Sequence, residues 1–372
     1  MAKKKILILH YNLQAGGAER VLVNLLKYLS RDKYDVTLKT IFGAGPYVKS
    51  VPKDIRFSYV FKNEFKGFNT LMKLFSGKLL HRLFIHDRYD IEIAYLENSP
   101  TRIVSSCPHK ETKKVGWVHT EVHEPGNLQA GFRNKEEMIQ AYNRLDYLVF
   151  VARRAMECFQ EKLPAINVPS HVLHNVNDIE LIKKLSKEPV STELGADVLN
   201  ICFVGRLVYA KGVPRLVKAF SRLKKDDLLN KVRLYVIGRG EDEEMIRQSI
   251  IDENLTNEII MLGFDKNPYR YISKMDLFAC SSYREGYSTA TTEAIALGVP
   301  VFTTDCSGMD EILDNGRFGM IVPNDDESIY QGLKDLLTHR EKINLYAEAI
   351  RSGANFTTQA LVDEYEKFFD SL

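Results

Sequence analysis

The sequence predicts an α/β protein with two doubly wound parallel-sheet domains, and three observations support this fold class. Apolar runs of strand length recur along the chain, each followed by a loop and an amphipathic stretch. This order of strand, loop and helix restarts near residue 199, and the sequence shows no hairpin-type turns between the runs. The length of 372 residues is typical of two domains of roughly 150–200 residues each.

The composition limits the class of protein and its partners. Apolar residues make up 45% of the chain, and no run approaches the roughly 18 apolar residues that suggest a membrane span. The five cysteines show neither metal-ligand nor redox spacing, so we expect buried thiols in the cytoplasm. Residues 1–175 carry 27 Lys and Arg against 17 Asp and Glu, although the whole chain carries 51 against 49. The basic first half predicts an anionic partner, and its interleaved apolar residues favour a phospholipid surface or a lipid diphosphate over nucleic acid.

The first apolar run, Ile6–Leu9, is typical of a parallel strand that is covered on both faces. It leads into a loop that contains Gly16 and Gly17 and then into an amphipathic helix from Val21. This is the opening unit of a nucleotide-binding half, although a plain tight turn is the alternative interpretation of the two glycines. The spaced glycines of a dinucleotide fingerprint are missing, so we do not expect NAD.

Three more buried strands are expected in the first half at residues 35–41, 90–96 and 146–151, and a fourth ends at His119. The carboxyl end of a strand is where open α/β sheets bind ligands, so His119 is a candidate site residue. Glu121 and His123 follow it and raise a metal hypothesis. No partner cluster of ligands exists elsewhere in the sequence, so we expect no metal, and the roles of Glu121 and His123 stay open.

Residues 62–88 form a basic amphipathic segment in which Phe, Leu and Met alternate with Lys and Arg. The pattern predicts two helices broken at Gly77. Such a segment can lie in a membrane interface with its cations near anionic lipid. The alternative is a pair of core-packing helices whose polar face is basic.

The second half repeats the rhythm, with strands expected at 199–204, 232–237, 259–264, 276–280 and 299–303. The loop after the first of these reads Gly205-Arg-Leu-Val-Tyr-Ala-Lys-Gly212 and precedes a helix with Pro214 in its first turn. Arg206 and Lys211 are thereby brought to one strand-to-helix junction. Two cations at such a junction favour an anionic ligand, whereas solvated surface cations are the alternative.

The segment from Cys280 to Val301 carries the most informative pattern. It holds two carboxylates, Glu285 and Glu293, with the small polar run Ser288-Thr289-Ala290-Thr291-Thr292 between them. Ser288 or Thr289 is expected to cap a helix that Gly298 ends. A strand, a loop and a helix N-terminus in this order form an anion site, most often for phosphate. We expect Glu293 to reach a ribose, and Glu285 to be free to accept hydrogen bonds from a sugar ring.

The whole string resembles the segment with two Glu residues eight positions apart in retaining glycosyltransferases with the GT-B fold, most closely glycosyltransferase family 4. The resemblance covers nearly the whole chain and is strongest over residues 199–323. It implies that Glu285 contacts the donor sugar, that Glu293 binds the nucleotide ribose, and that amides of the turn hold the diphosphate. The residues assigned to the turn are Ser288, Thr289 and Ala290.

The resemblance also assigns site residues elsewhere in the chain. It implies that Arg206 and Lys211 bind the diphosphate and that His119 lies near the transferred sugar as the active-site histidine. With Glu285, these form the expected catalytic set. The further donor-binding positions that it implies are Gly16, Gly17, Gly205, Gly238 and Phe264.

The expected organisation is a Rossmann-like acceptor-binding domain over residues 1–178 and a nucleotide-sugar-binding domain over 179–355. The two face each other across a cleft, and a C-terminal helix over 356–372 crosses back to the first domain, as the fold implies. The expected activity is a retaining hexosyltransferase that moves a sugar from a nucleotide diphosphate, UDP-linked, to a hydroxyl of a lipid-linked or polysaccharide acceptor. The sequence contains no Asp-x-Asp pair, so we expect metal independence and no cofactor.

Two functions of other classes remain open. One is a non-catalytic nucleotide-sugar-binding module, and the other is a nucleotide-sugar epimerase of related fold that needs no acceptor. We expect a cytoplasmic protein, with residues 62–88 in contact with the inner face of the cell membrane and with no nucleic-acid partner.

Overall fold

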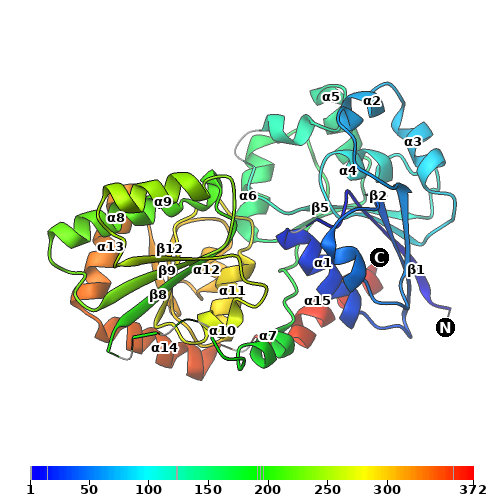
Figure 1. Cartoon of the computed structure of the whole chain (residues 1–372). Helices are drawn as coiled ribbons and strands as arrows, with labels where there is room; N and C mark the ends of the chain where they lie inside the picture. The colour runs from blue at the N-terminus through cyan, green and yellow to red at the C-terminus, as the bar shows by residue number, and fades with distance from the viewer. Residues whose placement is uncertain are drawn as a thin grey trace. The chain divides into compact units, whose positions relative to one another are not determined.

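The computed structural model describes residues 2–14, 16–122, 125–190, 192, 194–195, 197–354 and 356–372, so His123 lies outside the described residues. Within these ranges the chain divides into two compact units (Figure 1). Unit 1 comprises the chain up to Val176 together with Thr358–Leu372, and unit 2 comprises Asn177–Thr357. The predicted fold class, two α/β domains with parallel sheets, is confirmed.

Unit 1 is built on a seven-stranded sheet in the order β3-β2-β1-β4-β5-β6-β7, and the pairings between neighbouring strands are parallel. Ile6 of the central strand pairs with Val36 on one side and Ile91 on the other. Strand order therefore reverses between β1 and β4, which creates a topological switch point. The strands are β1 (Lys4–His10), β2 (Tyr34–Phe42), β3 (Arg56–Phe61), β4 (Ile91–Ala94), β5 (Lys113–Val118), β6 (Tyr147–Phe150) and β7 (Ser170–Val172).

The helices of unit 1 cover this sheet and place its loops. The predicted amphipathic helix after the glycine loop is α1, and the basic segment forms two short helices, α2 and α3, as expected. Ser76 caps α3 by accepting a hydrogen bond from the backbone N–H of Leu79 at 3.3 Å. The helices are α1 (Gly17–Tyr28), α2 (Phe68–Met72), α3 (Gly77–Phe84), α4 (Ser99–Val104), α5 (Lys135–Tyr142), α6 (Arg153–Lys162) and α15 (Thr358–Ser371), with 3₁₀ turns at Pro46–Ser50 and Pro125–Gln129.

The C-terminal helix α15 belongs to unit 1, which confirms the predicted return of the chain to the first domain. The Tyr365 ring stacks on Trp117 of β5 at 5.6 Å between centroids, and the Tyr365 hydroxyl donates to the His174 carbonyl. The hydroxyl of Tyr34 donates to the carbonyl of Glu366. Aromatic burial and these bonds attach the last helix to a sheet that starts more than 300 residues earlier.

Unit 2 contains a six-stranded parallel sheet in the order β10-β9-β8-β11-β12-β13, with its switch point between β8 and β11. The strands are β8 (Leu199–Val204), β9 (Val232–Ile237), β10 (Ile259–Gly263), β11 (Leu277–Cys280), β12 (Val301–Thr304) and β13 (Gly319–Val322). The helices are α7 (Ile179–Leu185), α8 (Val213–Lys225), α9 (Glu243–Asp252), α10 (Tyr269–Ile272), α11 (Thr289–Ala296), α12 (Met309–Ile312), α13 (Asp326–Thr338) and α14 (Glu341–Gly353), with a 3₁₀ turn at Tyr209–Lys211.

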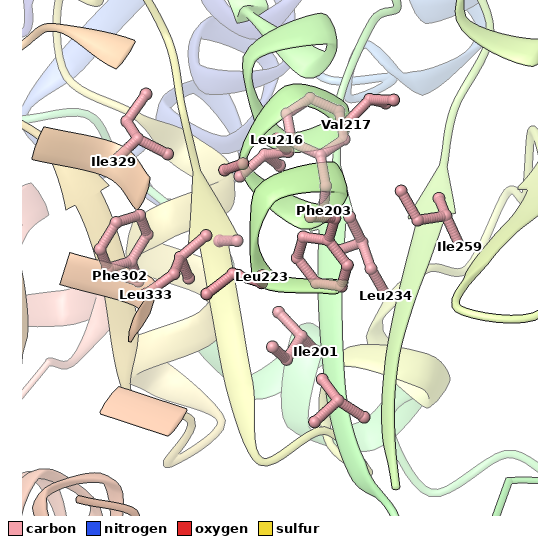
Figure 2. Packing of buried hydrophobic residues seen from close by; sticks show 14 of the residues in the cluster. Ile201, Phe203, Leu216, Val217, Leu223, Leu234, Ile259, Phe302, Ile329 and Leu333 are labelled. Carbon is pink, nitrogen blue, oxygen red and sulfur yellow. The ribbon is translucent and has the colours of Figure 1, made fainter. Parts of the chain in front are cut away.

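The core of unit 2 fixes the sheet against α8 and α13 (Figure 2). The helices contribute Leu216 and Leu333, and the sheet contributes Phe203, Leu234 and Phe302, all at most 2% exposed. Burying one such side chain stabilises the fold by roughly 1.5–3 kcal/mol. This rigid packing holds the carboxyl ends of β8 and β11 side by side, and the loops that leave those ends carry the candidate site.

No helix of the described ranges is long and apolar enough to cross a membrane. The sequence did not indicate β3, β7 and β13, each of which lies at the edge of its sheet and pairs with one neighbour. β7 and β13 span only three and four residues, and β3 alternates polar with apolar residues, so their hydrophobic signal is short or weak.

Candidate functional site

Two loops meet at the switch point of unit 2. One connects β8 to α8 and the other connects β11 to α11. The backbone N–H of Tyr283 donates to the carbonyl of Ala210 at 2.9 Å, and the hydroxyl of Ser281 donates to the carbonyl of Gly212 at 2.9 Å. The two loops are therefore one bonded structure at the edge of the sheet where open α/β proteins bind ligands.

Gly212 allows this close approach. Its φ is +63°, a left-handed conformation that residues with a Cβ rarely adopt. A Cβ at this position would lie 2.2 Å from the carbonyl oxygen of Ser281. Only glycine both turns the chain into α8 and leaves room for the neighbouring loop. Steric constraints therefore explain why glycine follows Lys211.

Lys211 and Glu285 form an ion pair across the two loops. The Lys211 Nζ lies 2.7 Å from Oε1 and 2.8 Å from Oε2 of Glu285, and the Ser282 hydroxyl donates to Oε1 at 2.6 Å. Burial is the largest single influence on the pKa of Lys211 and lowers it, but the charges of Glu285 and Cys280 and the hydrogen bond to Glu285 together raise it by more, so the pKa lies above its ordinary value. The charge of Arg206 opposes this rise.

The expectation that Glu285 is free to accept hydrogen bonds is thus wrong, because its carboxylate already accepts from Lys211 and Ser282. The Glu285 side chain is 9% exposed, and a buried carboxylate needs a partner to offset its lost hydration. Lys211 and Ser282 supply that partner. A ligand that binds here has to share these groups or displace one of them.

Arg206 is the second residue after β8 and is exposed, whereas Gly205, directly after the strand, is half-buried. Its guanidinium adds a second positive charge at the same edge, close enough to influence the titration of Lys211. The two predicted cations therefore lie close enough for their charges to interact. Lys211 is paired with Glu285, and Arg206 is exposed to solvent.

Helix α11 begins where the sequence predicted it. The Ser288 hydroxyl accepts a hydrogen bond from the Thr291 backbone N–H at 3.3 Å, which confirms Ser288 as the N-cap. Thr289 and Ala290 are half-buried in the first turn. The uncapped amides of a first turn carry partial positive charge, which favours an anion.

Glu293 lies in the fifth position of α11 and is 2% exposed. The hydroxyl of Tyr269, at the start of α10, donates to its Oε1 at 3.3 Å. The carboxylate is therefore embedded in unit 2 and oriented by the phenol of Tyr269, a side chain that is not among the predicted site residues. In the sequence Tyr269 follows Pro268, and nothing in this local pattern indicates its hydrogen bond to Glu293.

Gly238 and Phe264 follow the carboxyl ends of β9 and β10. Gly238 approaches Gly205 so closely that a Cβ would lie 1.9 Å from the Gly205 carbonyl oxygen, and its N–H donates to Gly263 at 2.8 Å. Phe264 is 61% exposed. The predicted positions of unit 2 thus lie on the loops after β8, β9, β10 and β11 and in the first two turns of α11, which follows the carboxyl end of β11.

His119 lies at the corresponding edge of unit 1. Its Nε2 is 3.0 Å from the Tyr95 carbonyl, and its backbone N–H donates to Glu97 Oε1 at 2.7 Å. Burial lowers the pKa of His119 to about 4, so the ring is neutral at pH 7. A carbonyl only accepts, so Nε2 carries the proton and Nδ1 remains an acceptor. Burial also raises the pKa of the Glu97 carboxyl, a residue that the sequence did not indicate.

Gly16 and Gly17 stand at the switch point of unit 1, after β1. Gly16 is the N-cap of α1 with extended backbone, and Gly17 is its first residue. Beside them, His10 ends β1 fully buried, and burial lowers its pKa to about 3. The predicted glycine loop therefore lies on the same edge of the sheet as the end of β4.

The groups that suggested a metal are placed differently. Glu121 accepts from the Cys158 thiol and lies 3.6 Å from Arg154, so its charge is matched within unit 1. Among the described residues, the side chains that could hold an ion are instead His81, Glu92 and Cys107. His81 and Cys107 each hydrogen-bond to Glu92, which lies near the amino end of β4, away from the edge that carries His119.

Comparisons with known proteins agree with this geometry. Residues 187–354 match the family model of glycosyl transferases group 1. The chain is 29% identical over 360 residues to the N-acetylgalactosamine-N,N'-diacetylbacillosaminyl-diphospho-undecaprenol 4-alpha-N-acetylgalactosaminyltransferase of Campylobacter jejuni, covering 94% of this chain and 95% of that protein. The matched range contains Arg206, Lys211, Glu285 and Glu293. Both similarities are to glycosyltransferases.

Solved structures share the fold. HepE of Anabaena in complex with UDP superposes with a TM-score of 0.74 at 18% identity, covering 99% of this chain and 100% of that one. WaaG, a glycosyltransferase involved in lipopolysaccharide biosynthesis, superposes with a TM-score of 0.71 at 16% identity, covering 97% of this chain and 98% of that one.

Proposed function

We propose that this protein is a retaining glycosyltransferase of family 4 that transfers a hexose-type sugar from a UDP-sugar to a hydroxyl of a lipid-linked or polysaccharide acceptor in surface glycan biosynthesis. The observation that carries the proposal is the Lys211–Glu285 pair at the switch point of unit 2, on loops that also carry Arg206 and the N-cap Ser288. The family match over residues 187–354 supports the reaction class.

The donor is proposed to bind along the carboxyl edge of unit 2. In this arrangement the diphosphate contacts Arg206, Lys211 and the first-turn amides of α11, Glu293 holds the ribose, and Phe264 lies near the base. The choice of UDP follows HepE, whose structure contains UDP. The Campylobacter relative, named for a lipid diphosphate acceptor, supports the acceptor class.

The chemistry requires stabilisation of the leaving diphosphate. As the bond from the anomeric carbon to oxygen breaks, negative charge collects on the β-phosphate. An ammonium has three N–H donors, and Lys211 directs two of them to Glu285, which leaves one for a phosphate oxygen. Two cations and the end of a helix can supply the charge that a divalent ion supplies elsewhere, so we propose that transfer needs no metal.

The acceptor end of the reaction is proposed to lie at a membrane. In residues 62–88, Phe68, Met72, Leu80 and Phe84 are buried, but six other apolar side chains are exposed. These lie among the exposed cations Lys62, Lys66, Lys78, Arg82 and Arg88. We call this set the 62–88 surface; its apolar members are Phe65, Leu71, Leu74, Phe75, Leu79 and Leu83.

A surface that mixes exposed Leu and Phe with cations suits an anionic membrane, because apolar side chains enter the headgroup boundary while cations meet lipid phosphate. Core packing alone does not account for Leu74, which is 74% exposed. We therefore propose a peripheral enzyme of the cytoplasm that contacts the inner face of the cell membrane through the 62–88 surface.

Ligand-dependent thermal stability tests the donor proposal. UDP should raise the melting temperature more than GDP or ADP, since a ligand that binds the native state stabilises it by RT ln(1 + [L]/Kd). Incubation with UDP-sugars and EDTA should then release UDP slowly without an acceptor. When an acceptor is added, the sugar in the product should be the same as in the donor and should keep the α-configuration at its anomeric carbon. That result would support a retaining transferase.

The same experiment separates the two alternative functions. An epimerase would convert the sugar of the UDP-sugar with nothing else present. A binding module would give the thermal shift without any release of UDP. Either result contradicts the proposed activity.

A further inference from the structure

A pair of tyrosines forms an exposed aromatic surface next to the Lys211–Glu285 pair. The rings of Tyr209 and Tyr283 stack with centroids 4.6 Å apart and planes inclined by 8°. Tyr209 is 71% exposed and Tyr283 is 36% exposed. Since Tyr283 covers one face of Tyr209, the exposure of Tyr209 belongs mainly to its other face and its edge.

The pair is held in place from inside the unit. The Arg215 guanidinium lies 4.3 Å from the Tyr283 ring centroid, and Arg215 is 2% exposed. It donates to Asp326 at 2.8 Å, to Asn324 at 2.6 Å and to the Ser281 carbonyl at 3.2 Å. Three acceptors fix the position of the Arg215 guanidinium, and its contact with the Tyr283 ring holds that ring in place. Tyr283 in turn supports the ring of Tyr209.

The position of the pair relates it to the candidate site. Tyr209 precedes Lys211 by two residues, and Tyr283 precedes Glu285 by two residues. The Tyr283 backbone N–H also donates to Ala210, the residue after Tyr209. The aromatic surface therefore belongs to the same two bonded loops as the ion pair.

We propose that Tyr209 and Tyr283 form a subsite for a pyranose ring of the acceptor glycan. A pyranose has an apolar C–H face and hydroxyls at its rim, which matches a tyrosine ring with its polar edge. A nucleobase would also stack, but the donor arrangement proposed above places the base near Phe264, on the loop after β10. The pair lies on the loops after β8 and β11. This inference rests on the proposed transferase function.

Saturation-transfer NMR on the full chain with UDP present tests the subsite. The probes are the methyl pyranosides of glucose, galactose, N-acetylglucosamine and N-acetylgalactosamine. At least one should receive saturation on its ring C–H protons in the wild-type protein. Tyr209→Ala should reduce that signal about fivefold, the size expected for loss of one aromatic contact. Tyr209→Phe should retain it, because the ring rather than the hydroxyl makes the contact.

Tyr59→Ala is the matched control, since Tyr59 is also exposed, at 47%, but lies on β3 of unit 1. It should leave the signal unchanged. The inference is overturned if no pyranoside receives saturation in the wild type, if Tyr209→Ala equals the wild type, or if Tyr209→Phe falls as far as Tyr209→Ala. The thermal shift with UDP is a separate readout. A normal UDP shift in any of these cases leaves the transferase proposal standing, whereas its loss in the wild type contradicts that proposal itself.

Discussion

The Lys211 ammonium lies within 2.8 Å of both carboxylate oxygens of Glu285, although the two residues are 74 positions apart in the sequence. The sequence patterns around them give each residue a different ligand, the diphosphate for the lysine and the sugar for the glutamate. Because Lys211 and Glu285 are in direct contact, the diphosphate and the sugar assigned to them would lie next to each other. A ligand that brings phosphate and sugar together meets a cation and an anion that already position each other.

Lys211→Met should abolish most transfer and also destabilise unit 2. It removes a charge proposed to stabilise the leaving phosphate, and loss of one such preorganised group typically costs about 10²–10³ in kcat. It also leaves the Glu285 carboxylate, 9% exposed, without its cation, and breaking a buried pair costs about 3–5 kcal/mol. Transfer rates with saturating UDP-sugar and urea unfolding measure the two effects.

Lys218→Met provides the control for this change. Lys218 is on the same helix-loop region, but its side chain is 71% exposed and its nearest carboxylate oxygen, on Asp326, is 3.7 Å away. Surface pairs of this kind contribute at most about 1 kcal/mol. If the two substitutions lowered kcat equally, loss of any positive charge in this region would explain the effect. That result would contradict the specific role of Lys211 at the leaving phosphate.

The stability of unit 1 should fall as the pH is lowered from 6.5 towards 4. The folded protein holds His119 with a pKa of about 4, whereas an exposed histidine has a pKa near 6.5. Between these values the unfolded chain binds a proton that the folded chain does not, so acid favours unfolding by at most about 1.4 kcal/mol per pH unit for each such histidine. Melting temperatures at pH 7 and pH 5 measure the loss.

His119→Asn should make the melting temperature less sensitive to pH over this range. His10 should keep most of its own contribution, because burial is the main cause that lowers its pKa and the charge of His119 is a smaller one. The comparison uses the change between the two pH values, so a uniform loss of stability in the variant does not affect it. The same pH sensitivity in wild type and variant would show that His119 is not held neutral by burial.

Tyr269→Phe should weaken UDP binding several-fold and reduce stability by about 1 kcal/mol, the usual net contribution of a hydrogen bond. The variant keeps the ring, which is 8% exposed, and removes only the phenol that donates to Glu293. Calorimetric titration with UDP measures affinity. Tyr271→Phe, in the same short helix, is the control, and a larger loss of UDP affinity there would argue against ribose binding by Glu293.

Binding to anionic vesicles should depend on the 62–88 surface. The double change Lys78→Glu and Arg82→Glu should weaken sedimentation with phosphatidylserine vesicles by at least about thirtyfold, because each cation near such a surface contributes about 1 kcal/mol. Leu79→Ser with Leu83→Ser should weaken binding to the same vesicles without changing its salt dependence, since these side chains are exposed and uncharged.

Lys225→Glu with Lys274→Glu changes the net charge equally at exposed positions of unit 2 and is the control. If this pair weakened sedimentation as much as the changes at Lys78 and Arg82, net charge rather than a defined surface would explain the binding.

The sequence indicated the central strands and the N-cap of α11 because their signals are local. Apolar runs such as Ile6–Leu9 are buried on both faces, and a Ser hydroxyl three residues from its acceptor N–H needs no distant partner. Strands β3, β7 and β13 were missed because β7 and β13 are only three and four residues long and β3 alternates polar with apolar residues. Tyr269 and Ser282 were missed because each acts on a carboxylate that only folding brings near.

By itself, the sequence determined the fold class and the residue types at the candidate site, since periodicity, glycine positions and helix caps depend on near neighbours. Only the tertiary structure decided that Glu285 is paired with Lys211 rather than free, that Tyr269 donates to the buried Glu293, and which contacts attach α15 to unit 1. The reason is physical: removing a charge or an aromatic ring from water requires compensating partners, and those partners come from segments far apart in the chain.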